Sequence, residues 1–523
     1  MPRPPWSPSR RAVGLAGPSA AEIRLPGGRG SEKLWRPHHD GATALNRPAL
    51  ATLRGLLESA SLPAACTEAV ALPGDEPGLP SSFRVGAAAQ ASIAAAALAA
   101  AEIHRRRGGP AQHVEVPLRH ALAEFRSERH LRLDDAPPPD PWDALAGLYR
   151  CGEGGAVRLH TNFPHHRDGI LALLGGLPPE REAVAAALRG WSAAAFEEAA
   201  AEAGLCVAML RDFAGWEAHP QGRALAGQPP LVIERMGDAP PTPLPPFGAR
   251  PLAGLRVLEM TRIVAGPVAG RCLAAHGAEV LHVSAAHLPS IPGLDMDTGR
   301  GKRTARLDLR QENGAARLRE LLQGADIFLQ SYRPGALAGR GFGEAAMAAL
   351  RPGLICVSLS AYGHRGPWAG RRGFDSLVQT ATGFNHAEAE AAGTPGQPRP
   401  LPCQALDHAS GYLLALGAMA ALLRRAEEGG SWRVRVSLAA TGQWLRGLGR
   451  VADGFAAPDP GQAEVADLLE ESESGFGRLR AIRHAARMSA TPARWEAPAM
   501  PLGSHEAAWI GGGAASSARP PPG

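Results

Sequence analysis

The chain has 523 residues, of which 45% are hydrophobic and 20% charged, values typical of a folded protein with more than one domain. Its net charge is only +5, and no basic block is interleaved with aromatic residues, so nucleic-acid binding is not expected. The six cysteines are far apart and form no CxxC pair, which indicates neither a zinc site nor a disulfide framework and is consistent with a cytoplasmic location. The apolar segments 85–101 and 413–423 are expected to be buried core helices, so no membrane partner is predicted.

The first part of the chain is predicted to hold a small α+β domain. Residues 1–40 are rich in Pro, Gly and Arg without periodicity and are predicted to be disordered. A helix and a strand are expected within 41–120. The small domain follows over 121–230, with a hairpin and then three helices. The Pro-rich stretch 231–250 is interpreted as a stiff linker.

After the linker, short apolar runs alternate with helical patterns over 251–450. This alternation predicts βαβ units and therefore an α/β fold with a Rossmann-like, doubly wound parallel sheet. Such sheets bind ligands beyond the carboxyl ends of their strands. No GxGxxG follows the first strand, which argues against an ordinary dinucleotide site. Residues 451–503 are expected to be a return segment and 504–523 a disordered tail. Strands are predicted at 255–260, 279–283, 304–309, 326–329 and 354–359.

A lone carboxylate at the head of an apolar helix is the most informative feature of the chain. Asp407 begins this helix, and no other acidic residue occurs from His408 to Arg424. The positive field of a helix N-terminus stabilises an ionised carboxylate, and apolar neighbours exclude water from it. These are the conditions that a nucleophilic carboxylate needs. The alternative interpretation is a plain N-cap, the role that Asp often has at helix starts.

An internal echo favours the chemical role of Asp407. Residues 94–118 and 415–438 both read as an apolar helix, a turn with basic residues and glycines, and a strand. The first copy has no carboxylate between Arg84 and Ala101. Since a structural cap would be useful in both copies, its presence in one copy only indicates chemistry.

The second half resembles the family III CoA-transferases, a family that includes formyl-CoA transferase, carnitine CoA-transferase and, as relatives, the α-methylacyl-CoA racemases. The resemblance is strong over 251–440 and weaker over 85–225. Because the order of the parts differs from that of the family, the chain looks like a rearranged or fused form. The segments that carry the resemblance are Leu252–Val280, Arg300–Arg303, Arg333–Gly335, Ser360–Gly363 and Gly373–Asp375 with Gln379.

The resemblance implies a catalytic site. The catalytic aspartate of the family matches Asp407, and a second acidic residue matches Asp375. Asp407 would attack the carbonyl of an acyl-CoA and form a mixed anhydride, with acyl-CoA and a carboxylic acid as substrates and no permanently bound cofactor. No metal is expected, since His160, His165, His166 and Asp168 are interpreted as solvent or substrate contacts. The candidate contacts for CoA are Lys302, Arg303, Arg333, Arg372, Gly266, Phe374 and His408.

Two alternative functions remain open on the sequence. The chain could be a catalytically silent CoA-binding or scaffold protein, because its first half lacks the carboxylate. It could also be an acyl-CoA racemase or epimerase, but the racemases have a histidine before the second acid, where this chain has Phe374. In the family, two chains interlock around the active site. Residues 85–225 are expected to supply within one chain what a partner supplies elsewhere, which gives a monomeric pseudo-dimer or a homodimer.

Overall fold

The computed structural model describes residues 46–511, so the predicted disordered segment 1–40 and residues 512–523 lie outside the described residues. A sheet of seven strands forms the centre, in the order β10-β9-β8-β11-β12-β13-β7. All neighbours are parallel except β13 and β7, which are antiparallel. This confirms the predicted α/β class with a parallel sheet. The strands are β7 (Leu231–Gly237), β8 (Arg256–Met260), β9 (Glu279–Ser284), β10 (Lys302–Arg306), β11 (Ile327–Gln330), β12 (Ile355–Ser360) and β13 (Ser431–Ser437).

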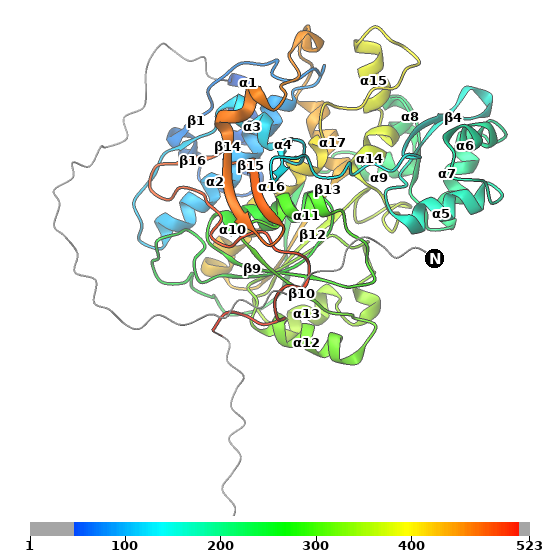
Figure 1. The fold of residues 1–523 in the computed structure, drawn as a ribbon. Helices are drawn as coiled ribbons and strands as arrows, with labels where there is room; N and C mark the ends of the chain where they lie inside the picture. The colour runs from blue at the N-terminus through cyan, green and yellow to red at the C-terminus, as the bar shows by residue number, and fades with distance from the viewer. Residues whose placement is uncertain (1–45, 512–523) are drawn as a thin grey trace, which may run out of the picture. The chain divides into compact units, whose positions relative to one another are not determined.

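Helices cover both faces of this sheet (Figure 1). Alternate residues of a strand point to opposite faces. Val257 of β8 therefore packs into the core with α10 (Ala265–Ala275) and α16 (Ala405–Glu428). Its neighbour Leu258 packs into a separate core with α12 (Glu312–Gln323) and α13 (Glu344–Leu350). Burial on both faces explains why the strands read as continuous apolar runs.

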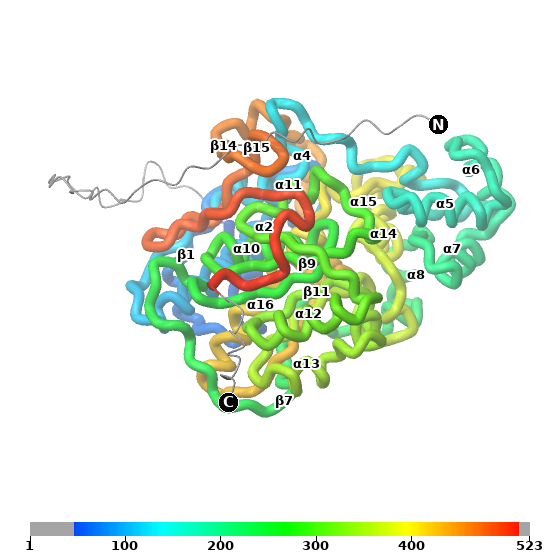
Figure 2. The backbone as a smooth tube through the Cα atoms, turned by 60° about the horizontal axis from the view of Figure 1, so that its bottom comes forward, coloured from blue at the N-terminus to red at the C-terminus, as the bar shows by residue number. Residues whose placement is uncertain are grey.

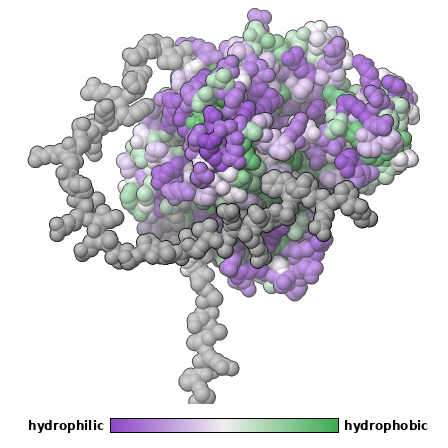
Figure 3. Space-filling view, in the orientation of Figure 1, coloured by the Kyte–Doolittle hydropathy of each residue, from purple (hydrophilic) through white to green (hydrophobic). Residues whose placement is uncertain are grey.

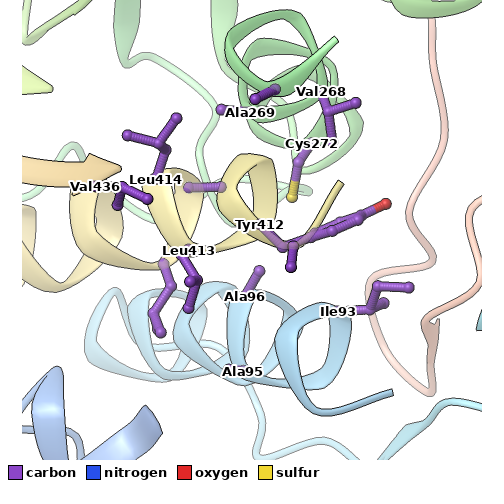
Figure 4. Packing of buried hydrophobic residues seen from close by; sticks show 14 of the residues in the cluster. Ile93, Ala95, Ala96, Val268, Ala269, Cys272, Tyr412, Leu413, Leu414 and Val436 are labelled. Atoms are coloured by element: carbon purple, nitrogen blue, oxygen red, sulfur yellow. The ribbon is translucent and has the colours of Figure 1, made fainter. Parts of the chain in front are cut away.

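The two helices of the internal echo pack against each other. The helix α2 (Val85–Arg106) lies along α16, with α10 on the other side of α16 (Figure 4). Tyr412 and Leu413 of α16 point into this cluster, which includes Ala96 of α2. By length and composition α2 and α16 are the two helices of the described chain that could cross a membrane, but 94% of each apolar window is buried inside the protein. Their apolar surface is therefore used for packing between the two halves.

A small domain forms a separate compact layer. The hairpin of β4 (Gly147–Arg150) and β5 (Ala156–Leu159) is extended by β6 (Val207–Met209), with antiparallel pairing throughout. Three helices pack on one face of this sheet, and they lie together in Figure 2. They are α5 (Pro164–Leu173), α6 (Arg181–Leu188) and α7 (Ala193–Glu202). The hairpin and three helices predicted from the sequence are thus present at this place.

The return segment joins the first half of the chain. Its strands β14 (Leu469–Ser474) and β15 (Gly477–Ile482) form a sheet with β3 (Arg132–Leu133), and β16 (Arg487–Met488) pairs with β2 (Val114–Glu115), which is parallel to β1 (Val70–Ala71). Hydrophilic residues cover β14 and β15 in Figure 3. The other helices are α1 (Arg47–Ser59), α3 (Leu118–Glu124), α4 (Ser127–His130), α8 (Phe213–Ala218), α9 (Pro220–Leu225), α11 (Pro292–Thr298), α14 (Asp375–Ala381), α15 (Phe384–Ala391) and α17 (Leu438–Gly447).

The structure differs from the predicted boundaries at two places. The strand β7 occupies the beginning of the range interpreted as a linker, 231–250, because its apolar residues add an edge strand to β13. The predicted tail from Ser504 is described as far as Gly511, and the indole N–H of Trp509 donates to the carbonyl of Leu321 at 3.1 Å.

Candidate active site

Two cavities meet at Asp407. We call the first the arginine chamber; it has a volume of about 290 Å³ and is lined by Arg262, Arg333 and Arg372. The second, the proline chamber, has a volume of about 440 Å³, and its wall includes three prolines between 138 and 141. Asp407 and Phe374 line both chambers. A carboxylate at this junction can therefore meet groups that enter from either side.

The carboxylate of Asp407 does not cap its own helix. The N-cap residue of α16 is Gln404, which makes no side-chain capping hydrogen bond. The backbone N–H of Asp407 instead donates to Asp375 Oδ2 at 2.9 Å, and the Leu406 N–H also contacts this carboxylate. A side chain from α14 thus satisfies donors that the first turn of a helix leaves open. The N-cap alternative is excluded for Asp407, whose own carboxylate is left for other contacts.

Burial makes the ionised form of Asp407 unstable. The residue is 8% exposed, and the pKa of its carboxyl is raised well above its ordinary value, first by burial and then by the negative charges of Asp375 and Glu128. A hydrogen bond from the Ala265 N–H, at the start of α10, acts in the opposite direction. Burial also raises the pKa of Asp375 to about 6, although its backbone donors and Gln379 oppose this shift. A carboxylate that is poorly stabilised as an anion is a more basic nucleophile.

The first half of the chain contributes a carboxylate to the site. Glu128 of α4 lies 3.1 Å from His408, measured from Oε2 to Nε2, and lines the proline chamber. His408 itself is 1% exposed and stacks on Phe125, with 5.4 Å between the ring centroids. This contact holds the first turn of α16, and with it Asp407, against the first half.

The arginine chamber lies at the carboxyl edge of the parallel sheet. Arg262 follows the end of β8, and Arg333 follows the end of β11. Arg372 contributes a third cation, whose Nη1 donates to the Gly204 carbonyl at 2.6 Å. The pKa of Arg333 is lowered by burial and by the charge of Arg372, so an anion between the two would be stabilised by both. The position agrees with the rule that α/β sheets bind ligands at this edge.

Two of the basic residues selected from the sequence do not reach the chambers. Lys302 is 3% exposed and forms an ion pair with Glu259, whose Oε2 lies 2.9 Å from Nζ. Its charge is thus neutralised inside the core. Arg303 lines a different cavity, near Arg256 at the amino ends of the strands, and donates to the Ala508 carbonyl. Neither residue lines the chambers beside Asp407, because both lie at the amino end of β10, whereas the arginine chamber lies at the carboxyl ends of the strands.

Gly266 and His408 are also placed away from the chambers. A Cβ atom on Gly266 would lie 2.5 Å from the Cβ atom of Thr261, so this glycine allows α10 to begin close to β8. His408 is buried against Glu128 and Phe125 and lines neither chamber. Neither residue lines a chamber; their contacts are with protein groups that hold the starts of α10 and α16 in place.

Aromatic and histidine side chains separate the two chambers. Phe374 stacks on His160 with 3.8 Å between the ring centroids, and burial lowers the pKa of His160 to about 3. His165 and His166 line the arginine chamber, where burial lowers the pKa of both. The lowered pKa values favour the neutral form of these histidines. Phe374 was predicted from the sequence, whereas His160 acquires its place only through the packing of the small domain against α14.

One further group of potential metal ligands is brought together in the core. Cys272, His276 and His484 are buried, with ligand atoms within 4.8 Å of one another. The pKa of His276 is lowered by burial, by His484 and by Arg250, and the pKa of His484 is lowered to about 3, first by burial and then by Arg271. Such positive surroundings disfavour a bound cation.

Sequence reasoning missed the residues that the first half supplies to the proline chamber. Glu128, Arg129, Trp142 and Arg158 are far in the chain from the segment that carries the motifs. The alternation of β5, with Val157 and Leu159 in the small-domain core, was the signal that could have found Arg158 on the opposite face.

The fold and the site define an α/β protein in which the largely buried carboxylate of Asp407 lines two cavities, one of them lined by three arginines. Residues 252–452 match the model of CoA-transferase family III. This segment of the chain is therefore similar to CoA-transferase family III.

Individual relatives are similar to parts of the chain. The chain is 32% identical over 314 residues to an acyl-CoA transferase of Gibberella moniliformis, which covers 56% of this chain and 55% of the relative. It is 34% identical over 163 residues to a succinate–glutarate CoA-transferase of Agrobacterium fabrum, covering 28% of this chain and 41% of the relative. The chain thus spans about half the length of these curated relatives. A CAIB/BAIF family protein from Brucella suis matches with 27% identity and a TM-score of 0.35, over 44% of this chain and 65% of that structure.

Proposed function

We propose that this protein transfers CoA from an acyl-CoA to a carboxylic acid through a covalent intermediate on Asp407. The observation that carries the proposal is the position of Asp407 where the two chambers meet, with its helix capped by Asp375 instead of by its own carboxylate. The names of the relatives describe acyl-CoA and dicarboxylate CoA-transferases, which supports the same reaction class.

In this proposal the two chambers bind different parts of the acyl-CoA. Arg262, Arg333 and Arg372 would bind the phosphates of CoA, since guanidinium groups form strong charge-assisted hydrogen bonds with phosphate oxygens. The pantetheine arm would then bring the thioester to Asp407, and the acyl group would lie in the proline chamber. In this pose no permanently bound cofactor or metal takes part in any step.

The transfer divides into balanced acyl exchanges. A carboxylate oxygen of Asp407 attacks the thioester carbonyl, the C–S bond breaks, and a mixed anhydride and CoA thiolate form. The thiolate attacks the aspartyl carbonyl of the anhydride, which gives an aspartyl-CoA thioester and releases the donor acid. The acceptor carboxylate attacks this thioester, giving a second anhydride and the thiolate. The thiolate then attacks the acceptor carbonyl, forming the new acyl-CoA and restoring Asp407.

The racemase alternative requires a base beside the acyl α-carbon. His160 is the histidine nearest to Phe374 by ring stacking, and its pKa of about 3 makes it a weak base. The silent-scaffold alternative does not explain why the carboxylate of Asp407 takes no part in capping its helix and is buried between two cavities. Both observations favour transfer.

The test uses acyl-CoA and mass spectrometry of the intact protein. Wild-type protein should gain a mass adduct on Asp407, and Asp407→Asn should show no adduct. The transfer rate of Asp407→Asn should be at least a thousandfold lower, which corresponds to about 4 kcal/mol in the activation barrier. Asp238→Asn is the control, since that side chain is 97% exposed. CoA binding without an adduct would support the scaffold alternative. Deuterium exchange at the acyl α-carbon without transfer would support the racemase.

A further inference from the structure

The side chain of His160 enters the proline chamber from the small domain. Strand β5 ends at Leu159, and Val157 and Leu159 enter the core of that domain. Because successive side chains of an extended segment alternate between its two faces, Arg158 and His160 lie on the opposite face and line the chamber. The backbone N–H of His160 donates to the Cys206 carbonyl at 3.0 Å, which fixes the backbone at this point.

Aromatic rings fix the orientation of the His160 imidazole. Phe374 stacks on it, with 3.8 Å between the ring centroids and 7° between the ring planes. The Trp142 ring lies at 67° to the imidazole, with 6.3 Å between the centroids. Phe374 and Asp407 both lie where the two chambers meet, whereas His160 lines the proline chamber only. The stacked imidazole is therefore on the proline-chamber side of that junction.

The imidazole of His160 has an unused hydrogen-bond donor. Its Nδ1 atom is fully buried without a partner, and Nε2 makes no hydrogen bond to any described residue. A neutral imidazole carries one proton, so that one nitrogen is a donor and the other an acceptor. Buried N–H groups without a partner are rarer in proteins than acceptors without one. We therefore assign the proton to Nε2, the nitrogen that the protein does not fully enclose, and this N–H faces the chamber.

This donor carries no charge at neutral pH. The pKa of His160 is lowered to about 3, first by burial and then by His166 and Arg158. A neutral imidazole forms no ion pair with Asp407, so it leaves the nucleophile free. Its N–H dipole can still stabilise a negative charge that develops on a bound substrate.

We propose that His160 is a catalytic residue of the transfer reaction, whose Nε2–H donates a hydrogen bond to the acyl carbonyl oxygen during the attack by Asp407. The inference rests on the proposed function, which places the thioester at Asp407 and the acyl group in the proline chamber.

The role of this hydrogen bond follows from the movement of electrons. As the Asp407 oxygen bonds to the carbonyl carbon, an electron pair of the C=O bond moves onto the carbonyl oxygen. The Nε2–H of His160 stabilises this negative oxygen and keeps its own proton. The pair then returns to restore the C=O bond, the C–S bond breaks, and CoA leaves as the thiolate. A donor that is already oriented stabilises the charged oxygen more than the neutral carbonyl, which lowers the barrier.

Two replacements of His160 separate its donor from its ring. His160→Phe keeps a ring of similar size against Phe374 and removes the donor, whereas His160→Gln keeps an N–H donor and removes the ring. We expect kcat of His160→Phe to fall about a hundredfold, with KM for acyl-CoA within about twofold of wild type, since the donor acts in the transition state. The kcat of His160→Gln should be about ten times that of His160→Phe. If the imidazole only packed the chamber wall, His160→Phe would be the more active variant, which would overturn the inference.

His386→Phe is the matched control. His386 lies on α15, its side chain is 38% exposed, and it lines neither chamber, so its replacement should leave kcat at the wild-type value. Equal kcat in wild-type protein and His160→Phe would contradict the inference while leaving the proposed function intact. If wild-type protein forms no adduct on Asp407 and transfers no CoA, the proposed function fails, and a measurement without turnover decides on the hydrogen bond.

Infrared spectroscopy provides that measurement. Acetyl-CoA with an isotopic label at the carbonyl carbon is bound to Asp407→Asn, which lacks the nucleophile, and the C=O stretch is recorded as an isotope-edited difference spectrum. Adding His160→Phe to this variant should move the band to higher frequency, because a hydrogen bond weakens the C=O bond. Adding His386→Phe should not move it. A band at the same frequency with and without His160, or no band from a bound thioester, would overturn the inference.

Discussion

Asp375 Oδ2 accepts a hydrogen bond from the backbone N–H of Asp407 at 2.9 Å, so one buried carboxylate caps the helix that carries the other. The two acids therefore have different tasks although both line the proline chamber. Asp375 is fixed by backbone donors and by Gln379, which also accepts from the Leu401 N–H at 2.9 Å. Asp407 is the acid that remains available for chemistry.

The first prediction concerns the pH dependence of activity. Asp375→Asn keeps an acceptor for the Asp407 N–H but removes a negative charge that raises the pKa of Asp407. The pKa of Asp407 should fall, and the acid limb of kcat/KM should move to lower pH. The loss of activity should be smaller than in Asp407→Asn. An acid limb at the wild-type position would contradict the electrostatic coupling of the two acids.

The second prediction concerns the pH dependence of stability. The folded-state pKa of Asp375 is about 6, above its ordinary value of 3.8, so the folded protein binds this proton more tightly than the unfolded chain. The resulting stabilisation is complete below the unfolded pKa and is lost as the pH rises through about 6. Asp375→Asn should therefore show a weaker fall in the free energy of unfolding between pH 5 and pH 7. Denaturant titrations test this, with Asp238→Asn as the control; equal falls in all three proteins would contradict it.

The third prediction tests the contribution of the first half. Glu128→Ala removes the partner of buried His408 and should lower the free energy of unfolding by about 3 kcal/mol, because it breaks a buried pair. It should also slow transfer, since the first turn of α16 loses its contact with α4. Glu153→Ala, at an exposed turn, should change neither quantity. If Glu128→Ala had the same free energy of unfolding as wild-type protein, the contact between Glu128 and His408 would not stabilise the first turn of α16.

The fourth prediction concerns the close approach of α10 and α16. A Cβ atom on Gly411 would lie 2.6 Å from Val268 and 2.8 Å from the Ala265 carbonyl. Gly411→Ala should therefore destabilise the protein by about 1–3 kcal/mol through overpacking. Gly55→Ala, in the middle of α1 with open space around its Cβ position, should stabilise it by up to about 1 kcal/mol. Thermal or denaturant unfolding measures both changes, and a neutral Gly411→Ala would mean that the helices can separate at little cost.

The fifth prediction concerns CoA. Binding of CoA should raise the unfolding temperature, and Arg333→Gln should reduce this shift and its dependence on salt. Arg303→Gln should not, because Arg303 lies at the opposite end of the strands. NAD should give no shift, as the glycine fingerprint for a dinucleotide is missing after β8. A loss of the CoA effect in Arg303→Gln but not in Arg333→Gln would mean that CoA binds at the amino ends of the strands, which would contradict the prediction.

The sequence by itself determined the elements of the second half. Alternating apolar runs and helical patterns predict β8 to β12 because local periodicity reflects burial on one or both faces. It also singled out Asp407, since an isolated carboxylate before a long apolar helix is visible in the chain without any knowledge of the fold. The echoed segments around α2 and α16 were visible for the same reason.

Only the tertiary structure decided what surrounds Asp407. Lys302 and Arg333 are both basic residues near strand ends. Lys302 lies at the start of its strand and forms an ion pair with Glu259 in the core, whereas Arg333 follows the end of its strand and lines the arginine chamber. Glu128 and Arg158 reach the site from segments more than two hundred residues away from Asp407 in the chain. Such contacts depend on how α2 packs along α16 and how the small domain packs on α14, and no local pattern encodes those long-range distances.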